Sequence, residues 1–130
     1  MTIERFEDLE IWKLAKELCK FVYKITEKEH FTKDFTFKNQ IRSSSGSVMD
    51  NIAEGFERDG TKEFIQFLSI AKGSCGECRS QSYRAFDYKY INLAVLVDMI
   101  EITTTLSRKI ASFMAYLKAD SYTHLRAHET

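Results

Sequence analysis

The residues with the clearest potential for chemistry are two cysteines that lie close together in the chain. Cys75 and Cys78 have the C-x-x-C spacing that can support thiol–disulfide exchange or metal binding. A redox pair of this kind normally opens a helix after a strand, whereas this pair lies inside a long helical pattern. A structural zinc site needs four ligands, and only Cys19 and His30 are otherwise available outside the last ten residues. We therefore expect the pair to be buried core thiols, with no metal and no cofactor.

A second candidate is a set of polar residues on a predicted helix and its neighbour. Asp50 and Glu54 are one helical turn apart, but the chain lacks the Glu-x-x-His pairs on facing helices that bundle di-iron sites use. Two interpretations stay open: a ligand or partner site, or a polar network that sets helix register or subunit pairing. We favour the network, because a buried polar group without a partner costs about 1–3 kcal/mol. The oligomer or polar-network set is Ser43, Ser44, Ser47, Asp50, Asn51, Glu54 and Glu77.

The serine-rich part of this set resembles a phosphate loop only superficially. The run from Ser43 to Ser47 lacks the lysine and the strand-to-helix setting of a P-loop. Small residues on a helix are useful where two helices approach closely, so we expect tight helix packing and self-association at this face. Catalysis is not expected, because His30 is the only histidine outside the last ten residues and no nucleophile–base set can be assembled. The sequence therefore predicts a protein that is not an enzyme.

Basic residues offer a weaker signal for nucleic-acid binding. The chain has 19 Lys and Arg against 19 Asp and Glu, and a net charge of zero argues against a diffuse nucleic-acid binder. A local ridge of basic residues is still compatible with a net charge of zero. The nearby Tyr83, Tyr88 and Tyr90 could stack on bases. A scattered, solvated surface is the alternative interpretation. The proposed nucleic-acid ridge consists of Arg42, Arg58, Lys62, Lys72, Arg79 and Arg84.

Four helical segments must position these residues. Apolar residues recur at helical spacing over residues 7–26, 37–57 and 62–87, and again from Leu93 to Leu117. Thr36 or Asp34 is expected to cap the second segment, Thr61 the third and Asn92 the fourth. The connection over residues 27–37 reads as a loop, with Phe31, Phe35 and Phe37 folding back on the bundle. The chain contains no proline, and short links favour antiparallel neighbours, so the predicted fold is an all-α, antiparallel up-down four-helix bundle.

Three blocks of sequence carry a family resemblance. They are FEDLEIWKLAKEL (6–18), SVMDNIAEGFER (47–58) and KEFIQFLSIAKGSCGE (62–77). Together they resemble the four-helix bundle proteins encoded in intervening sequences of bacterial 23S ribosomal RNA genes. That family is similar to the accessory subunit of diversity-generating retroelements, which is a pentameric barrel that binds nucleic acid beside a reverse transcriptase. The resemblance implies a homo-oligomer, a pentamer by this likeness, with RNA or a reverse-transcriptase-like protein as a partner.

The ends of the chain lead to separate expectations. The last ten residues, SYTHLRAHET (121–130), resemble a conceptual translation of a transposase-type sequencing adapter. We therefore expect residues 1–120 to form the bundle domain and residues 121–130 to be an artefactual tail. No apolar run approaches the ~20 residues that span a bilayer, and the N-terminus lacks the apolar core of a signal peptide. The expected location is cytoplasmic, with no membrane partner. The function expected is RNA or ribonucleoprotein binding by a helical oligomer, or a protein–protein interaction module without nucleic acid.

Overall fold

The computed structural model describes the backbone of residues 3–129 and the side chains of residues 3–120. The described residues contain helices and no strand, which confirms the all-α prediction. A short 3-10 turn, Phe6–Asp8, precedes four long helices. These are α1 (Glu10–Thr26), α3 (Phe35–Glu57), α4 (Thr61–Asp87) and α5 (Leu93–Glu129), with the short α2 (Glu29–Lys33) between α1 and α3.

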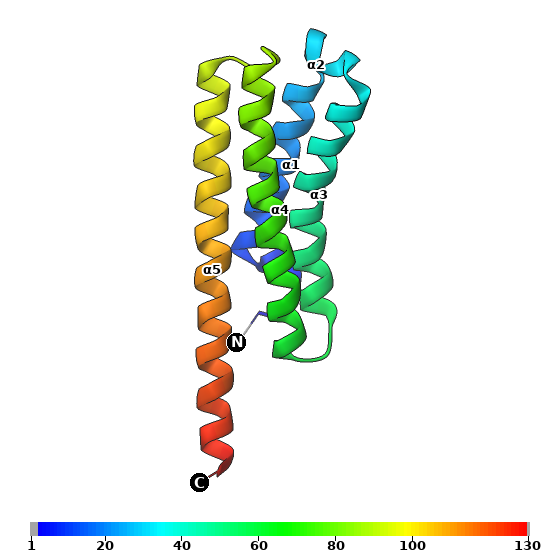
Figure 1. The fold of residues 1–130 in the computed structure, drawn as a ribbon. Helices are drawn as coiled ribbons and strands as arrows, with labels where there is room; N and C mark the ends of the chain where they lie inside the picture. The colour runs from blue at the N-terminus through cyan, green and yellow to red at the C-terminus, as the bar shows by residue number, and fades with distance from the viewer. Residues whose placement is uncertain (1–2, 130) are drawn as a thin grey trace.

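The four long helices run alternately up and down, as Figure 1 shows. The packing is not uniform around the bundle. α4 packs along both α3 and α5, and α1 packs along α3, whereas α1 and α5 touch much less. The predicted antiparallel bundle is therefore confirmed, but with one weakly closed side. No helix in the part of the chain that the structure describes is long and apolar enough to cross a membrane.

The helix boundaries follow from local hydrogen bonding. The Asp34 carboxylate accepts the Phe37 N–H at 3.1 Å, so Asp34, and not Thr36, caps α3. The Asn92 side chain accepts the Val95 N–H at 2.9 Å and caps α5 as predicted. Gly60 stands before α4 with φ of +115°, a conformation that L side chains rarely adopt. The predicted cap, Thr61, is instead the first residue of the helix.

The connection between α1 and α3 is more ordered than a loop, because it contains α2. Phe31 and Phe37 are fully or almost fully buried, and the Phe31 ring lies 5.0 Å from the ring of Tyr90. The Tyr90 hydroxyl donates to Asp34 at 2.8 Å, which ties this end of α3 to the α4–α5 connection. Phe35 points away and is 68% exposed, so the prediction that all three phenylalanines fold back is wrong for Phe35.

The core is formed by one apolar stripe from each long helix. At the lower end of the α3–α4 pair, a Cβ on Gly55 would lie 2.5 Å from the Cβ of Phe67. No real side chain tolerates that distance, so glycine is required for this close approach. The largest fully buried side chains are Phe31, Leu18, Ile41, Ile52, Leu68, Met99, Leu106 and Ile110.

Candidate functional site

The serine-rich face of α3 packs against α4 within the same chain. Ser44 is buried and its hydroxyl donates to the Gln81 side chain, and the Ser47 hydroxyl lies 2.8 Å from that of Ser74. Asn51 donates to the Ser47 carbonyl at 2.8 Å and to its hydroxyl at 2.9 Å. Small hydroxyl side chains satisfy one another where the two backbones are close, so these contacts fix the register of α3 against α4.

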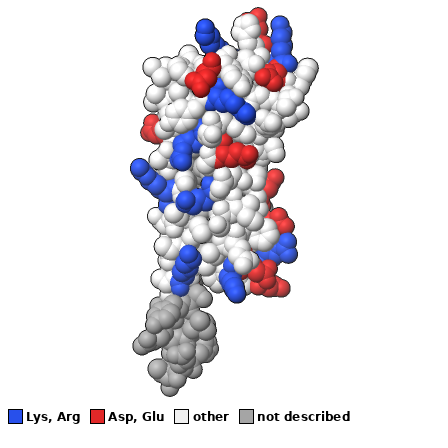
Figure 2. Space-filling model, in the orientation of Figure 1, with Lys and Arg blue, Asp and Glu red and all other residues white. Residues whose placement is uncertain are grey.

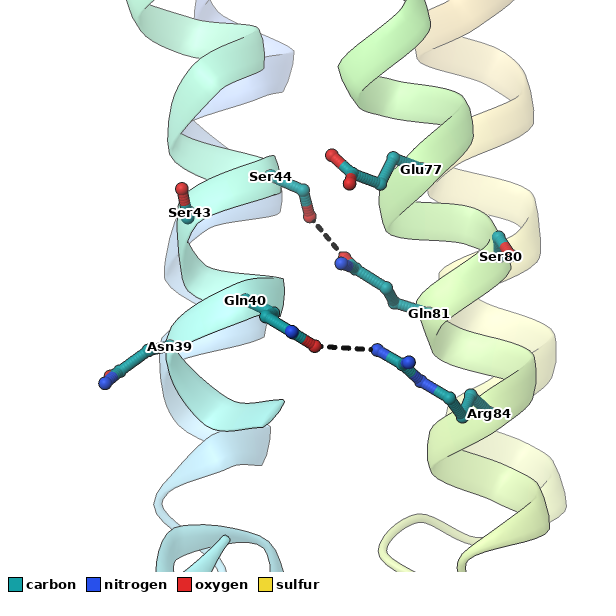
Figure 3. A pocket seen from close by; sticks show the side chains of 8 residues that line it. All are labelled: Asn39, Gln40, Ser43, Ser44, Glu77, Ser80, Gln81 and Arg84. Atoms are coloured by element: carbon teal, nitrogen blue, oxygen red, sulfur yellow. Dashed lines mark hydrogen bonds between the residues drawn. The ribbon is translucent and has the colours of Figure 1, made fainter. Parts of the chain in front are cut away.

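The upper part of this seam opens into a polar groove of about 610 Å³. Figure 3 shows two hydrogen bonds that bridge it, Ser44 to Gln81 and Arg84 to Gln40, the latter at 3.0 Å. The Arg84 guanidinium also lies 4.2 Å from the ring centroid of Phe37. Both contacts hold this arginine between the helices. The groove is lined by Asn39, Gln40, Ser43, Ser44, Glu77, Ser80, Gln81 and Arg84.

The predicted oligomer or polar-network residues therefore divide into two groups. Three of them, Ser44, Ser47 and Asn51, contribute to the contact between α3 and α4. The rest are exposed, and Glu54 forms an ion pair with Arg58 at 3.0 Å on the same helix. The exposed members are Ser43, Asp50, Glu54 and Glu77.

The two cysteines of the C-x-x-C pair lie in the core. Cys75 and Cys78 are both fully buried, and the Cys75 thiol donates to the Thr103 carbonyl of α5 at 3.2 Å. Burial raises the pKa of Cys75 to about 11 and that of Cys78 to about 12. Both thiols are thus protonated at neutral pH and poorly nucleophilic. Among the described residues, no three His, Cys, Asp or Glu side chains come together in a way that could hold a metal ion.

The predicted basic ridge is distributed over several sides of the bundle. Arg42 faces α1, where it donates to Glu27 and to Thr26 at 2.8 Å each. Arg58 pairs with Glu54 and lies 5.0 Å from the Phe67 ring. Arg84 is held in the α3–α4 groove, and Lys62 is exposed in the first turn of α4.

Lys72 and Arg79 lie together on a different side of α4. Lys72 is three residues before Cys75, and Arg79 is four residues after it. Because Cys75 faces α5, the two cations flank the α4–α5 contact. Arg108 is exposed on α5 at a similar height. Among residues 3–120, none of the three has a carboxylate within ion-pair distance. Figure 2 views this face and shows blue side chains near its middle, with a red group beside them and further red side chains at the top and along both edges.

A lysine face on α1 was not among the predicted sites. Lys13, Lys16, Lys20 and Lys24 are spaced by three, four and four residues and are all exposed. We define this lysine face as these four residues. It adjoins α3, because Tyr23 lies three residues from Lys20 and has Arg42 of α3 at 4.3 Å from its ring. The spacing was visible in the sequence, but its continuation into Arg42 required knowledge of how α1 packs.

The comparisons with known proteins agree with this architecture. A model of the family described as 23S rRNA-intervening sequence protein matches residues 7–112. A crystal structure from Bacteroides thetaiotaomicron, described as a protein with unknown function from the S23 ribosomal protein family, has a TM-score of 0.73 and 21% sequence identity. The match covers 80% of this chain and 97% of that chain, and at this identity it shows the fold alone. No curated protein matches the chain.

Proposed function

The chain belongs to the 23S rRNA-intervening sequence protein family, and from this membership we propose that it is a non-enzymatic assembly protein that binds RNA as a homo-oligomer. The family description and that of the S23 structure name no enzyme. Buried, protonated cysteines and polar residues that satisfy one another across a helix seam also favour a structural role over catalysis.

The observation that carries the RNA proposal is the lysine face of α1. Its four ammonium groups extend over roughly 16 Å of helix, at about 1.5 Å per residue, which suits the spacing of several phosphates along a strand. Among residues 3–120, Lys20 is the only one of the four with a carboxylate within 4.0 Å, namely Glu17 at 3.7 Å. Both side chains are 66% exposed, so this pair is weak. Tyr23 is 58% exposed at the edge of the face and offers a surface on which a base can stack.

Self-association would strengthen this weak site. A net charge of zero leaves one copy with limited attraction for RNA, but several copies in one assembly add their contacts through avidity. The family resemblance supports a pentamer as the assembly. A reverse-transcriptase-like protein is a further partner compatible with the same family resemblance.

RNA binding is tested by filter-binding titration of a structured RNA at several salt concentrations. We expect affinity to fall steeply with salt, with each phosphate contact contributing about 0.7–0.9 to the slope of log K against log salt. The variant Lys16→Glu/Lys20→Glu should lose at least about tenfold in affinity and show a shallower slope. The control Lys33→Glu/Lys89→Glu makes the same charge change at exposed sites outside the lysine face and should bind like the wild type.

The second candidate function is a protein–protein interaction module without nucleic acid. The balance of 19 basic and 19 acidic residues favours it. The same titration separates the two functions, because this candidate predicts no salt-dependent RNA binding by the wild type. Equal affinities for the lysine-face variant and its control would instead remove the lysine face as the site.

A further inference from the structure

The weakly closed side of the bundle contains an apolar groove. It lies between α1 and α5, has a volume of about 290 Å³, and has Leu14, Phe21 and Ile102 on its floor. Carboxylates surround it: Glu17 on α1, and Asp98 and Glu101 on α5. Among the described side chains, Asp98 and Glu101 have no basic partner within 4.0 Å, and Glu17 has Lys20 at 3.7 Å, both exposed. The groove is therefore apolar inside and acidic at its rim.

The adjoining side of α5, which shares Glu101 and Thr105 with the groove, is more basic. Val97 is 52% exposed and Tyr83 of α4 is 49% exposed, and Ile100 lies partly buried beside them. The cations Lys72, Arg79 and Arg108 stand around these apolar side chains on α4 and α5, without carboxylate partners among residues 3–120. We define the basic docking face as these six residues, three apolar and three basic. Beside it, a Cβ on Gly76 would meet nothing within 4 Å, so another backbone can approach α4 there.

We propose that the α1–α5 groove of one copy receives the basic docking face of the next copy. Apolar side chains would be covered on both partners, and three cations would meet three carboxylates. The two surfaces adjoin along α5, where Glu101 and Thr105 line both. The groove is completed by α1 and the docking face by α4, so the contact joins different faces of the two copies. Such head-to-tail contacts form rings when the rotation closes and open filaments when it does not. The proposal rests on the homo-oligomer in the proposed function and assigns the residues that make its interface.

Charge reversal on each surface tests the assignment by light scattering at micromolar concentration. Arg79→Glu/Arg108→Glu alters the docking face alone, and Glu17→Lys/Asp98→Lys alters the groove alone. Each double variant should place like charges opposite one another and weaken assembly at least about tenfold, giving monomers where the wild type is assembled. The quadruple variant carries all four changes, restores opposite charges across the contact and should regain the wild-type mass. Glu57→Lys/Asp59→Lys is the control, because both residues are exposed at the α3–α4 turn.

The outcomes separate this proposal from the proposed function. Double variants that keep the wild-type mass would overturn the face assignment and leave the oligomer standing. A wild type that scatters as a monomer would overturn both. Circular dichroism checks that each variant is helical, and Val97→Asp, at an exposed apolar position, is an independent variant that should also give monomers. RNA affinity is measured separately with the lysine-face variant, which should keep the wild-type mass.

Discussion

The close approach of α3 and α4 at Gly55 makes a quantitative prediction for Gly55→Ala. The new methyl group would lie 2.5 Å from the Cβ of Phe67 and 3.0 Å from Cδ1 of Phe64. The Phe67 Cβ cannot rotate away, so the helices must separate, and overpacking of this kind costs up to about 3 kcal/mol. Alanine recovers about 1 kcal/mol of helix propensity. The expected net loss is about 2 kcal/mol, or about 8 °C in Tm at roughly 4 °C per kcal/mol.

Gly46→Ala is the matched control on the same helix. An alanine Cβ there would meet nothing within 4 Å, so only the propensity gain of up to about 1 kcal/mol remains and Tm should rise. Both variants are compared with the wild type by urea denaturation followed by circular dichroism at fixed protein concentration, since oligomers unfold in a concentration-dependent way. If Gly55→Ala is as stable as Gly46→Ala, the close-approach reasoning is refuted.

Three further predictions concern polar groups and a buried thiol. Ser44→Ala leaves Gln81 without its partner and should lower the free energy of unfolding, measured by urea denaturation, by about 1–2 kcal/mol. The double variant Ser44→Ala/Gln81→Leu should recover part of this loss. If the costs of the two single changes simply add, the pairing is contradicted. Asp34→Ala removes the α3 cap and should lower stability by about 1 kcal/mol, whereas Asp34→Asn should retain most of it. Burial raises the folded-state pKa of Cys78 from 9.0 to about 12, so the stabilising effect of the neutral thiol is complete below pH 9 and is lost as pH rises toward 12. Stability of the wild type should therefore fall more steeply than that of Cys78→Ala between pH 9 and 11, and parallel curves would count against a buried thiol.

The helices and the fold class were predictable because apolar residues repeat at helical spacing along nearly the whole chain. The details at helix ends were not, because several residues can supply a cap. Asp34 and Thr36 both precede the apolar stripe of α3, and only the geometry shows that the Asp34 carboxylate reaches the Phe37 N–H. Phe35 illustrates a related limit: Phe37, two positions later, is buried, but helical rotation turns the ring of Phe35 outward.

The candidate sites were predictable only in part, because periodicity identifies a helix face but does not identify the neighbour that covers it. The sequence singles out Ser44 and Ser47 as unusual on α3, but it does not show that α4 of the same chain covers them. The lysine face shows the converse. Its spacing is plain in the sequence, but the position of Arg42 of α3 against Tyr23 beside it is a tertiary contact that periodicity does not predict.

The slight contact between α1 and α5 has a consequence for how the molecule opens. α4 is held on both flanks, whereas α1 is held chiefly by α3, so the four helices form an open array rather than a closed cylinder. Native-state hydrogen exchange should then find two cooperative units. The amides of α1 should exchange through a sub-global opening, while those in the middle of α4 exchange only when the whole domain unfolds. A second copy bound across this open side would remove the difference by raising the protection of α1.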